Sequence, residues 1–271
     1  MSAARSPVAA PELRGFTCVA LLGTGGYSDV YLYEQERPRR PVAVKVLLAA
    51  GLTEARRTQF AAEADLMAQV SAHPYIVNIF GADVADDGRP YLVMEYYPRP
   101  HLGVRARRER LSVPEVLAIG IQVAGAIETA HRLSILHRDI KPANILTSQY
   151  GRPGLSDFGI SANTQIHVED DVGGMSIPWA APEVFRPETD PDERSDVYSL
   201  GATVWHLLAG RSPFELPGAD NSPLAMMQRV ERENVMPTGR DDVPAPLERA
   251  LAQSMRKSPE ARQPSAFAFA R

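Results

Sequence analysis

The order of apolar and polar positions predicts strands in the first part of the chain. Between residues 16 and 48, short runs of valine, tyrosine and leucine are separated by glycines, and residues 41–46 alternate as a strand does. Strand character returns at residues 90–97 and stops at Pro98 and Pro100, which interrupt regular structure. The pattern therefore indicates a small β-rich unit that ends near residue 97.

Helical spacing appears first between the strand-like segments and then dominates the rest of the chain. Residues 53–70 place apolar side chains at every third or fourth position, which predicts one helix packed on the sheet. Ser112 precedes Glu115 by three residues, the spacing of a capping box, and an apolar stretch follows. Residues 196–209 are apolar nearly all round and end before Gly210, so we expect a central helix there.

These patterns predict an α+β protein with two parts. A flexible N-terminal segment is expected at residues 1–14, a smaller β-rich part over 15–97 and a larger, mainly helical part over 98–271. The absence of internal repeats excludes a solenoid. The sequence stops within an amphipathic helical pattern, so we expect it to come from a longer protein.

Composition narrows the class of protein. An apolar content of 44% is ordinary for a chain that buries a core. A net charge of −4 and a pI near 5.9 argue against nucleic acid as a partner, because proteins that bind the phosphate backbone usually carry a basic face. Cys18 is the single cysteine, and neither a signal segment nor an apolar run of about 18 residues occurs. We therefore expect a cytoplasmic location and no membrane segment.

A glycine-rich segment, GTGGYSDV at 23–30, lies between two predicted strands. Gly23 and Gly25 carry no Cβ, so backbone N–H groups there can approach phosphate oxygens, although a glycine-rich hairpin turn explains the same pattern. Lys45 ends the strand-like VAVK and can reach phosphates if a carboxylate holds it, and Glu63 on the predicted helix can supply that carboxylate. A solvated lysine at a strand end is the alternative interpretation.

A more specific pattern is HRDIKPAN at 137–144, which places an acid, a lysine and an amide on one loop. Asp139 can accept the proton of a substrate hydroxyl, Lys141 can neutralise a travelling phosphoryl group, and Asn144 can ligate Mg²⁺. Asp157, in the triplet DFG that follows, offers a second oxygen ligand. The spacing predicts a site for phosphoryl transfer.

The glycine-rich loop, VAVK, HRDIKPAN, DFG and an APE triplet at 181–183 each occur once and in this order. By these motifs the chain resembles the eukaryotic-type protein kinases, and in HRDIKPAN the bacterial serine/threonine branch, from about Gly15 to its end. The resemblance implies a two-lobed kinase fold, with 15–97 as the small lobe and 98–271 as the large one. It also implies ATP with Mg²⁺ or Mn²⁺ as cofactors and protein serine or threonine hydroxyls as substrates, including autophosphorylation in a dimer.

The resemblance further implies roles for individual residues. Asp139 is the implied catalytic base, Lys141 and Lys45 contact phosphates, Glu63 pairs with Lys45, and Asp196 anchors the catalytic loop. A lysine at position 141 also marks serine/threonine rather than tyrosine kinases. The implied metal ligands are Asn144 and Asp157. The implied nucleotide contacts are Gly23, Thr24, Gly25, Gly26, Val30, Ala43, Lys45, the gatekeeper Met94, Glu95, Tyr97 and Leu146.

Other residues are implied to be scaffold rather than chemistry. His137 and Phe158 are expected to pack in a spine together with Met67. Glu183 and Arg262 are expected to form a buried ion pair, and removal of one partner strands the other charge at a cost of roughly 3–5 kcal/mol.

Two positions depart from the family pattern, one in the phosphate loop and one in the segment from Asp157 to Glu183. Ser28 replaces the third glycine of the phosphate loop, and Ser176 stands where a threonine is common, which keeps a hydroxyl able to bond Asp139 and Lys141.

A regulatory arrangement is also predicted from this segment. Arg138 is a cation of the kind that binds a phosphate carried by the segment from Asp157 to Glu183. An acidic residue at 169–171 can take the place of that phosphate. An exposed acidic loop and autophosphorylation at a hydroxyl are the alternatives. The candidate regulatory residues are Arg138, Ser161, Thr164, Glu169, Asp170, Asp171 and Ser176.

Two rival functions remain to be weighed. A pseudokinase has no need for a base and both metal ligands, so the joint presence of Lys45, Glu63, Asp139, Asn144 and Asp157 argues against a purely binding role. A small-molecule kinase of related fold lacks the APE-type segment, which forms a platform for peptides. The sequence therefore favours a protein kinase.

Overall fold

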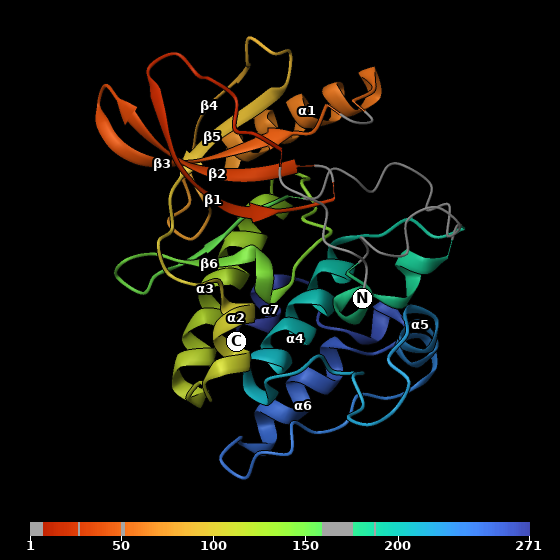
Figure 1. Ribbon diagram of the computed structural model, residues 1–271. Helices are drawn as coiled ribbons and strands as arrows, with labels where there is room; N and C mark the ends of the chain where they lie inside the picture. The colour runs from red at the N-terminus through yellow and green to blue at the C-terminus, as the bar shows by residue number, and fades with distance from the viewer. Residues whose placement is uncertain (1–7, 27, 50–51, 159–175, 187) are drawn as a thin grey trace. The chain divides into compact units, whose positions relative to one another are not determined.

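A computed structural model describes residues 8–26, 28–49, 52–158, 176–186 and 188–271 (Figure 1). The chain divides into two compact units, Met1–Pro98 and Arg99–Arg271, and each is described by itself. The first unit contains a five-stranded antiparallel sheet and one helix. Its elements are β1 (Phe16–Thr24), β2 (Ser28–Glu36), β3 (Arg39–Leu47), α1 (Glu54–Val70), β4 (Ile79–Val84) and β5 (Pro90–Glu95).

The spatial strand order is β1-β2-β3-β5-β4, so β3 lies at the centre of the sheet. Alternate residues of β3 face opposite sides, as a strand requires. Val42, Val44 and Val46 are buried in one cluster with Tyr31 and Tyr33 of β2. These residues confirm the predicted alternation over 41–46, whereas the last strand of the unit stops at Glu95, two residues before the predicted end.

Helix α1 confirms the helix predicted from the spacing over 53–70. Its N-cap is Thr53, whose side chain accepts a backbone hydrogen bond from the first turn. Phe60 and Ala64 of α1 are buried in one cluster with Leu47 of β3 and Leu92 of β5. The helix therefore packs on the face of the sheet opposite to the tyrosine and valine cluster.

Residues before β1 are held against the sheet, which differs from the flexible segment expected over 1–14. The Tyr31 hydroxyl donates to the Val8 carbonyl oxygen at 2.5 Å, and the Tyr33 hydroxyl donates to that of Pro11 at 2.6 Å. Leu13 is buried in the same cluster as these tyrosines. Buried hydroxyls need acceptors, and the chain before the sheet supplies them. Residues 1–7 lie outside the described part of the chain.

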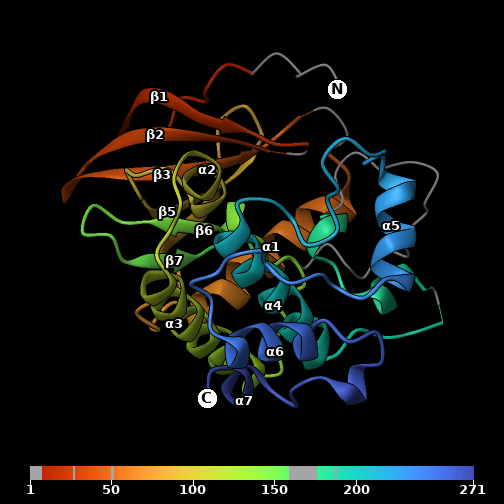
Figure 2. The same cartoon turned by 90° about the horizontal axis from the view of Figure 1, so that it is seen from below.

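The second unit is mainly helical and carries one short hairpin (Figures 1 and 2). Its helices are α2 (Leu102–Arg108), α3 (Val113–His131), α4 (Glu193–Ala209), α5 (Pro223–Arg232), α6 (Ala245–Ser254) and α7 (Ala266–Phe269). Its strands are β6 (Ile145–Thr147) and β7 (Pro153–Leu155), and its 3₁₀ turns are Pro142–Asn144, Ile177–Trp179, Pro182–Phe185 and Pro259–Ala261.

Helix α4 forms the centre of this unit. It is buried along most of its length and contacts α3, α6 and α7. Close contact with α6 requires Gly201, because a Cβ there would lie 1.8 Å from the Ser254 Oγ. The helix ends at Gly210 in a left-handed conformation, as predicted, but begins at Glu193 rather than at 196. The earlier start follows from Asp192, which forms a capping box with Ser195.

Helix α3 begins as predicted at Ser112, whose Oγ accepts the Glu115 N–H at 3.3 Å. The Glu115 carboxylate pairs with Arg105 at 3.0 Å instead of returning to the cap, so only half of the predicted capping box is formed. Among the described residues, α3 is the one helix long and apolar enough to cross a membrane by length and composition. Half of that stretch is buried inside the unit, and core helices of globular proteins pass the same test.

Candidate active site

In the first unit, the strand register places four predicted nucleotide contacts, Val30, Ala43, Lys45 and Met94, on one face of the sheet. Lys45 pairs with Val30 of β2 and with Leu92 of β5, and Ala43 pairs with Met94. Directly paired residues of antiparallel strands share a face, and residues two apart on one strand do so as well. All five therefore lie on the face opposite to the buried tyrosines, which is also the face that α1 packs on.

The glycine-rich segment forms the turn of the β1–β2 hairpin, with Gly23 paired to Val30. The Gly25 N–H donates to the Ser28 carbonyl oxygen at 2.7 Å, and a Cβ on Gly25 would lie only 3.0 Å from that oxygen. A side chain at 25 would crowd the turn, whereas a Cβ on Gly26 would meet no other atom within 4 Å. The segment is thus a hairpin turn. Its role as a phosphate-binding loop is compatible with this turn and stays a prediction.

The predicted partners Lys45 and Glu63 lie on neighbouring elements. Lys45 is on the α1 side of β3, and Glu63 belongs to the α1 turn between Phe60 and Ala64, the two residues that pack on the sheet. The side chain of Glu63 lies outside what the structure describes. The Lys45–Glu63 ion pair therefore stays a prediction that this placement supports.

The predicted hinge begins where β5 ends. The Glu95 N–H donates to the Asn78 carbonyl oxygen at 2.9 Å, and the Asn78 side chain donates to the Glu95 carboxylate at 2.7 Å. Met94 and Tyr97 are both buried. Because Asn78 holds Glu95 through backbone and side chain together, the residues after Met94 have a fixed path.

In the second unit, the predicted catalytic residues are joined by direct hydrogen bonds. Lys141 Nζ lies 2.7 Å from the Asp139 Oδ2 and 2.7 Å from the Ser176 Oγ. Asn144 Nδ2 donates to the Asp139 backbone oxygen at 2.8 Å and to its Oδ2 at 2.9 Å. These bonds confirm the expected contact of Ser176 with Lys141. The Asp139 side chain keeps 31% of its surface exposed, so the carboxylate is fixed yet accessible.

Asp196 anchors the loop that carries HRDIKPAN, as expected. Its carboxylate accepts the backbone N–H of His137 at 2.7 Å and that of Arg138 at 2.8 Å, and the His131 Nε2 lies 2.8 Å away. Burial alone would raise the pKa of Asp196, but the bonds from His131 and from the loop outweigh it and lower that pKa. A charged Asp196 thereby holds Arg138 in a left-handed conformation, with φ of 65°.

His137 serves as packing, in agreement with its predicted role. Its Nδ1 accepts the Asp139 N–H at 3.2 Å, so the ring proton resides on Nε2, which donates to the Ser156 carbonyl oxygen at 3.1 Å. Burial lowers the pKa of His137, which keeps the ring neutral. The ring lies 4.5 Å from that of Phe158, and the third predicted member, Met67, is buried within the first unit.

The hairpin of β6 and β7 brings the two predicted metal ligands together. Ile145 pairs with Leu155, so Asn144 before β6 and Ser156 after β7 lie at the same end. The Ser156 Oγ donates to the Asn144 backbone oxygen at 3.2 Å and to the Asp157 Oδ2 at 3.0 Å. Asp157 has φ of 58°, a strained conformation that recurs at functional sites. Leu146, a predicted nucleotide contact, lies in β6 between two buried residues.

This pair of residues fits a magnesium ion better than a metal bound by protein alone. The Asn144 Nδ2 is used by Asp139, which leaves the amide oxygen as its ligand atom, and Asp157 offers a carboxylate. Mg²⁺ typically takes one or two protein oxygens together with water and phosphate. In the described ranges no group of three or more His, Cys, Asp or Glu side chains could hold a metal.

Several predicted regulatory residues cannot be placed. Ser161, Thr164, Glu169, Asp170 and Asp171 all lie outside the described residues.

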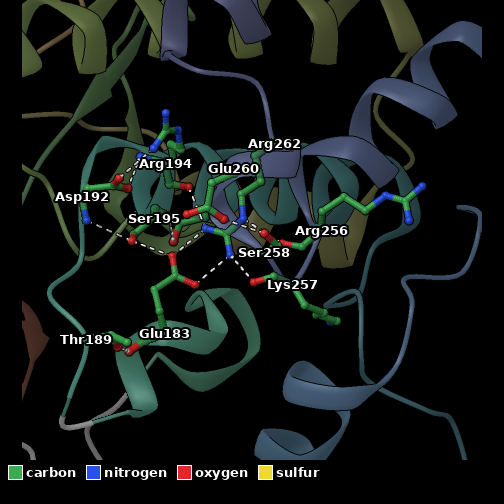
Figure 3. A network of polar contacts seen from close by, with 11 residues as sticks. Glu183, Thr189, Asp192, Arg194, Ser195, Arg256, Lys257, Ser258, Glu260 and Arg262 are labelled. Atoms are coloured by element: carbon green, nitrogen blue, oxygen red, sulfur yellow. Dashed lines mark hydrogen bonds and ion pairs between the residues drawn. The ribbon is translucent and has the colours of Figure 1, made fainter.

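A buried ion pair joins Glu183 to Arg262, as predicted (Figure 3). The two guanidinium Nη atoms lie 2.6 and 2.7 Å from the two carboxylate oxygens, and the side chains are 0% and 6% exposed for Arg262 and Glu183. The remaining three guanidinium N–H groups donate to the backbone oxygens of Arg194, Arg256 and Lys257. All five donors are thus used, which offsets the cost of burying the charge.

Next to this ion pair, the environment of Lys257 is expected to make the stability of the fold depend on pH. Its Nζ bonds the Val230 oxygen at 2.5 Å and lies 4.4 Å from the Phe214 ring, and burial, with the charge of Arg262, lowers the pKa of Lys257 from 10.5 to about 8. Between these values the unfolded chain holds a proton that the folded chain does not, so the free energy of unfolding rises with pH.

Replacement of Lys257 by methionine is expected to make the free energy of unfolding rise less steeply between pH 8 and 10. The difference in slope corresponds to about one bound proton. Urea unfolding at several pH values measures that slope, with Lys257→Met compared against the original protein so that other titrating groups cancel. An identical slope in both proteins contradicts the prediction.

Some residues of the site are not predicted from the sequence. No role for His131 follows from the motifs, yet it contacts the loop anchor Asp196. A usable signal existed, since His131 continues the apolar spacing of α3 four residues after the buried Ile127. Ser195, which bonds Glu183 at 2.7 Å, was also missed, and nothing in its local sequence marks that contact.

Comparison with known proteins agrees with this geometry. Residues 16–266 match the family model described as protein kinase domain. The serine/threonine-protein kinase PknK of Mycobacterium tuberculosis is 36% identical over 254 residues, which are 93% of this chain and 23% of that protein. The serine/threonine-protein kinase PknF of the same species is 34% identical over 276 residues, covering 95% and 55%. The chain therefore spans 23% of the length of one of these relatives and 55% of the other.

A solved structure supports the fold. The crystal structure of the Mycobacterium tuberculosis PknI kinase domain matches with a TM-score of 0.69 and 28% sequence identity, covering 98% of this chain and 97% of that chain. A sheet-containing unit followed by a helical unit is thus the arrangement expected for a domain of this kind.

Proposed function

The chain belongs to the protein kinase domain family, and we propose that it transfers the γ-phosphoryl group of ATP to serine or threonine hydroxyls of proteins. The observation that carries this proposal is the set of hydrogen bonds among Asp139, Lys141, Asn144 and Ser176. It links one loop to a residue 35 positions further along the chain from Lys141. The relatives named serine/threonine-protein kinases support the choice of hydroxyl.

In the proposed reaction Asp139 accepts the proton of the substrate hydroxyl as the oxygen attacks the γ-phosphorus. Lys141, held between Asp139 and Ser176, neutralises negative charge on the phosphoryl oxygens as they leave ADP. The chain's own contribution is mainly positioning, because the Asp196 carboxylate fixes the loop through two backbone N–H groups.

Asn144 and Asp157 are the residues that would hold Mg²⁺, with Mn²⁺ as a substitute of the same coordination chemistry. When bound, such an ion would neutralise negative charge on the phosphates. On the sheet, Lys45 is proposed to contact the α- and β-phosphates with Glu63 as its partner. The other proposed nucleotide contacts are Gly23, Thr24, Gly25, Gly26, Val30, Ala43, Met94, Glu95, Tyr97 and Leu146.

We propose that the protein acts in the cytoplasm on protein substrates and that two copies associate for autophosphorylation. For its regulation we propose that an acidic residue at 169–171 pairs with Arg138 in place of a phosphate. Phosphorylation at Ser161 or Thr164 is the competing arrangement. A carboxylate binds arginine less strongly than a doubly charged phosphate, so the proposal implies basal activity without modification.

Incubation of the purified chain with Mg-ATP is expected to leave phosphate on serine and threonine, of a generic basic protein or of the chain itself. Mass spectrometry that maps the phosphosites reports activity, residue preference and regulation together, and parallel samples with Mn²⁺ or with a chelator report the metal requirement. Absence of any phosphorylated hydroxyl, with nucleotide still bound, would identify a pseudokinase. Phosphate on a small molecule alone would indicate a small-molecule kinase.

A further inference from the structure

A pocket of about 440 Å³ lies in the second unit, at the ends of α2 and α4 and beside the loop before α6. Its lining comes from residues 106–110, 207–211 and 238–240. The volume is within the 300–1,000 Å³ usual for ligand sites. None of the residues proposed for phosphoryl transfer lines it, so the pocket is separate from that chemistry.

Positive charge is concentrated in this pocket. Five arginines and one glutamate line it, although the whole chain has a net charge of −4. The arginines are Arg107, Arg108, Arg110, Arg211 and Arg240. Like charges gathered around one cavity repel each other, and an anion in the cavity relieves that repulsion.

Two of the five arginines have structural partners. Arg240 donates to the backbone oxygens of Leu111 at 2.8 Å and Leu208 at 3.1 Å and pairs with Asp242 at 2.7 Å. Arg110 pairs with the same carboxylate at 2.8 Å, with 66% of its side chain exposed. Arg240 in particular satisfies a carbonyl at the end of α4, the usual role of a cation at a helix C-terminus.

The other three, Arg107, Arg108 and Arg211, have neither an ion pair nor a hydrogen bond from the side chain to any described residue. The Arg211 Nε is buried without an acceptor, and its guanidinium lies 5.3 Å from the centre of the Trp205 ring. A buried donor without an acceptor is costly and rare in native proteins. A role at a helix C-terminus does not account for this buried donor, because no carbonyl of a described helix accepts a hydrogen bond from Arg211.

We propose that this arginine pocket binds a phosphate group carried on a serine or threonine of a peptide segment. The planar guanidinium matches two phosphate oxygens at once, and several such groups around one cavity suit a dianion better than a carboxylate. The volume leaves room for peptide beside the phosphate. The choice of a phosphopeptide over free phosphate rests on the proposed function, since a serine/threonine kinase produces phosphorylated chains.

Binding of fluorescent peptides, measured by anisotropy without ATP, tests the pocket. A phosphoserine peptide library with random flanking residues is expected to bind at least about tenfold more tightly than the same library without phosphate. The variants Arg108→Glu and Arg211→Ala are each expected to weaken the phosphopeptide by about tenfold, whereas Arg249→Ala, an exposed arginine on α6 that lies outside the pocket, leaves it unchanged.

Other outcomes overturn the proposal. If phosphorylated and unphosphorylated libraries bind equally well, the pocket does not recognise phosphate. If inorganic phosphate binds as tightly as the phosphopeptide, the pocket does not recognise the peptide. Selective binding to vesicles of anionic lipid would assign the pocket to a membrane instead. Because Arg108 is exposed, Arg108→Glu is expected to fold even if Arg211→Ala does not. An unchanged affinity of Arg108→Glu for the phosphopeptide library contradicts the proposal.

The peptides are synthetic and the assay holds no nucleotide, so binding is independent of catalysis. Loss of phosphoryl transfer with intact phosphopeptide binding contradicts only the proposed function. Intact transfer without phosphopeptide binding contradicts only the arginine pocket.

Discussion

Replacement of Asp139 by asparagine is expected to lower the rate of phosphoryl transfer by about 10²–10⁴-fold, the usual contribution of a positioned general base. The carboxylate accepts bonds from Lys141 at 2.7 Å and from Asn144 at 2.9 Å. An amide oxygen of the same shape can accept both. Asp139→Asn therefore removes the proton acceptor while it preserves the local structure of the loop.

Single-turnover transfer to a peptide, together with ATP affinity measured by calorimetry, separates chemistry from binding. We expect the transfer rate to fall and the dissociation constant of ATP to stay within about twofold, because the proposed nucleotide contacts lie elsewhere. Asp241→Asn is the matched control, since that side chain is exposed in the same unit. Full turnover in Asp139→Asn would mean that another group is the base.

Replacement of Arg262 by methionine is expected to lower the free energy of unfolding by about 3–5 kcal/mol, because it leaves the buried Glu183 carboxylate without its partner. The loss includes two charge-assisted bonds of 2.6 and 2.7 Å. It also leaves the backbone oxygens of Arg194, Arg256 and Lys257 without the donor that now serves them. Few single substitutions combine these effects, so this one is expected to be among the most destabilising in the second unit.

Urea unfolding compares this variant with Arg256→Ala, in which an exposed side chain is lost but the carbonyl that accepts from Arg262 is kept. The control is expected to change stability by less than about 0.5 kcal/mol. A loss below about 1 kcal/mol in Arg262→Met contradicts the prediction, and so does an equal loss in both variants.

The same ion pair sets a pH dependence with a defined sign. Burial alone would raise the pKa of Glu183, but the bonds from Arg262 outweigh it and lower that pKa below its ordinary value of 4.5. A lowered carboxylate pKa gives stability that is present above 4.5 and lost as pH falls through the folded-state value. The extra sensitivity to acid is therefore expected in the original protein and absent after the ion pair is removed.

The sequence alone predicted the main elements and the grouping of Asp139, Lys141 and Asn144, because these follow from local spacing. Alternation over 41–46 and helical spacing over 53–70 predict a strand and a helix without knowledge of their neighbours. HRDIKPAN fixes Asp139, Lys141 and Asn144 within six residues, so their proximity needs no long-range contact. The family resemblance then supplied the pairing of Glu183 with Arg262, which no local pattern contains.

Tertiary structure alone decided those contacts between distant groups that neither local spacing nor the family resemblance supplies. His131 and Asp196 are 65 residues apart and contact each other only because α3 and α4 pack together. The arginine pocket likewise combines the ends of α2 and α4 with a later loop, three segments whose arginines look like ordinary surface charges in sequence. Local sequence encodes propensity and spacing, whereas the burial and the charge around a side chain depend on everything folded against it.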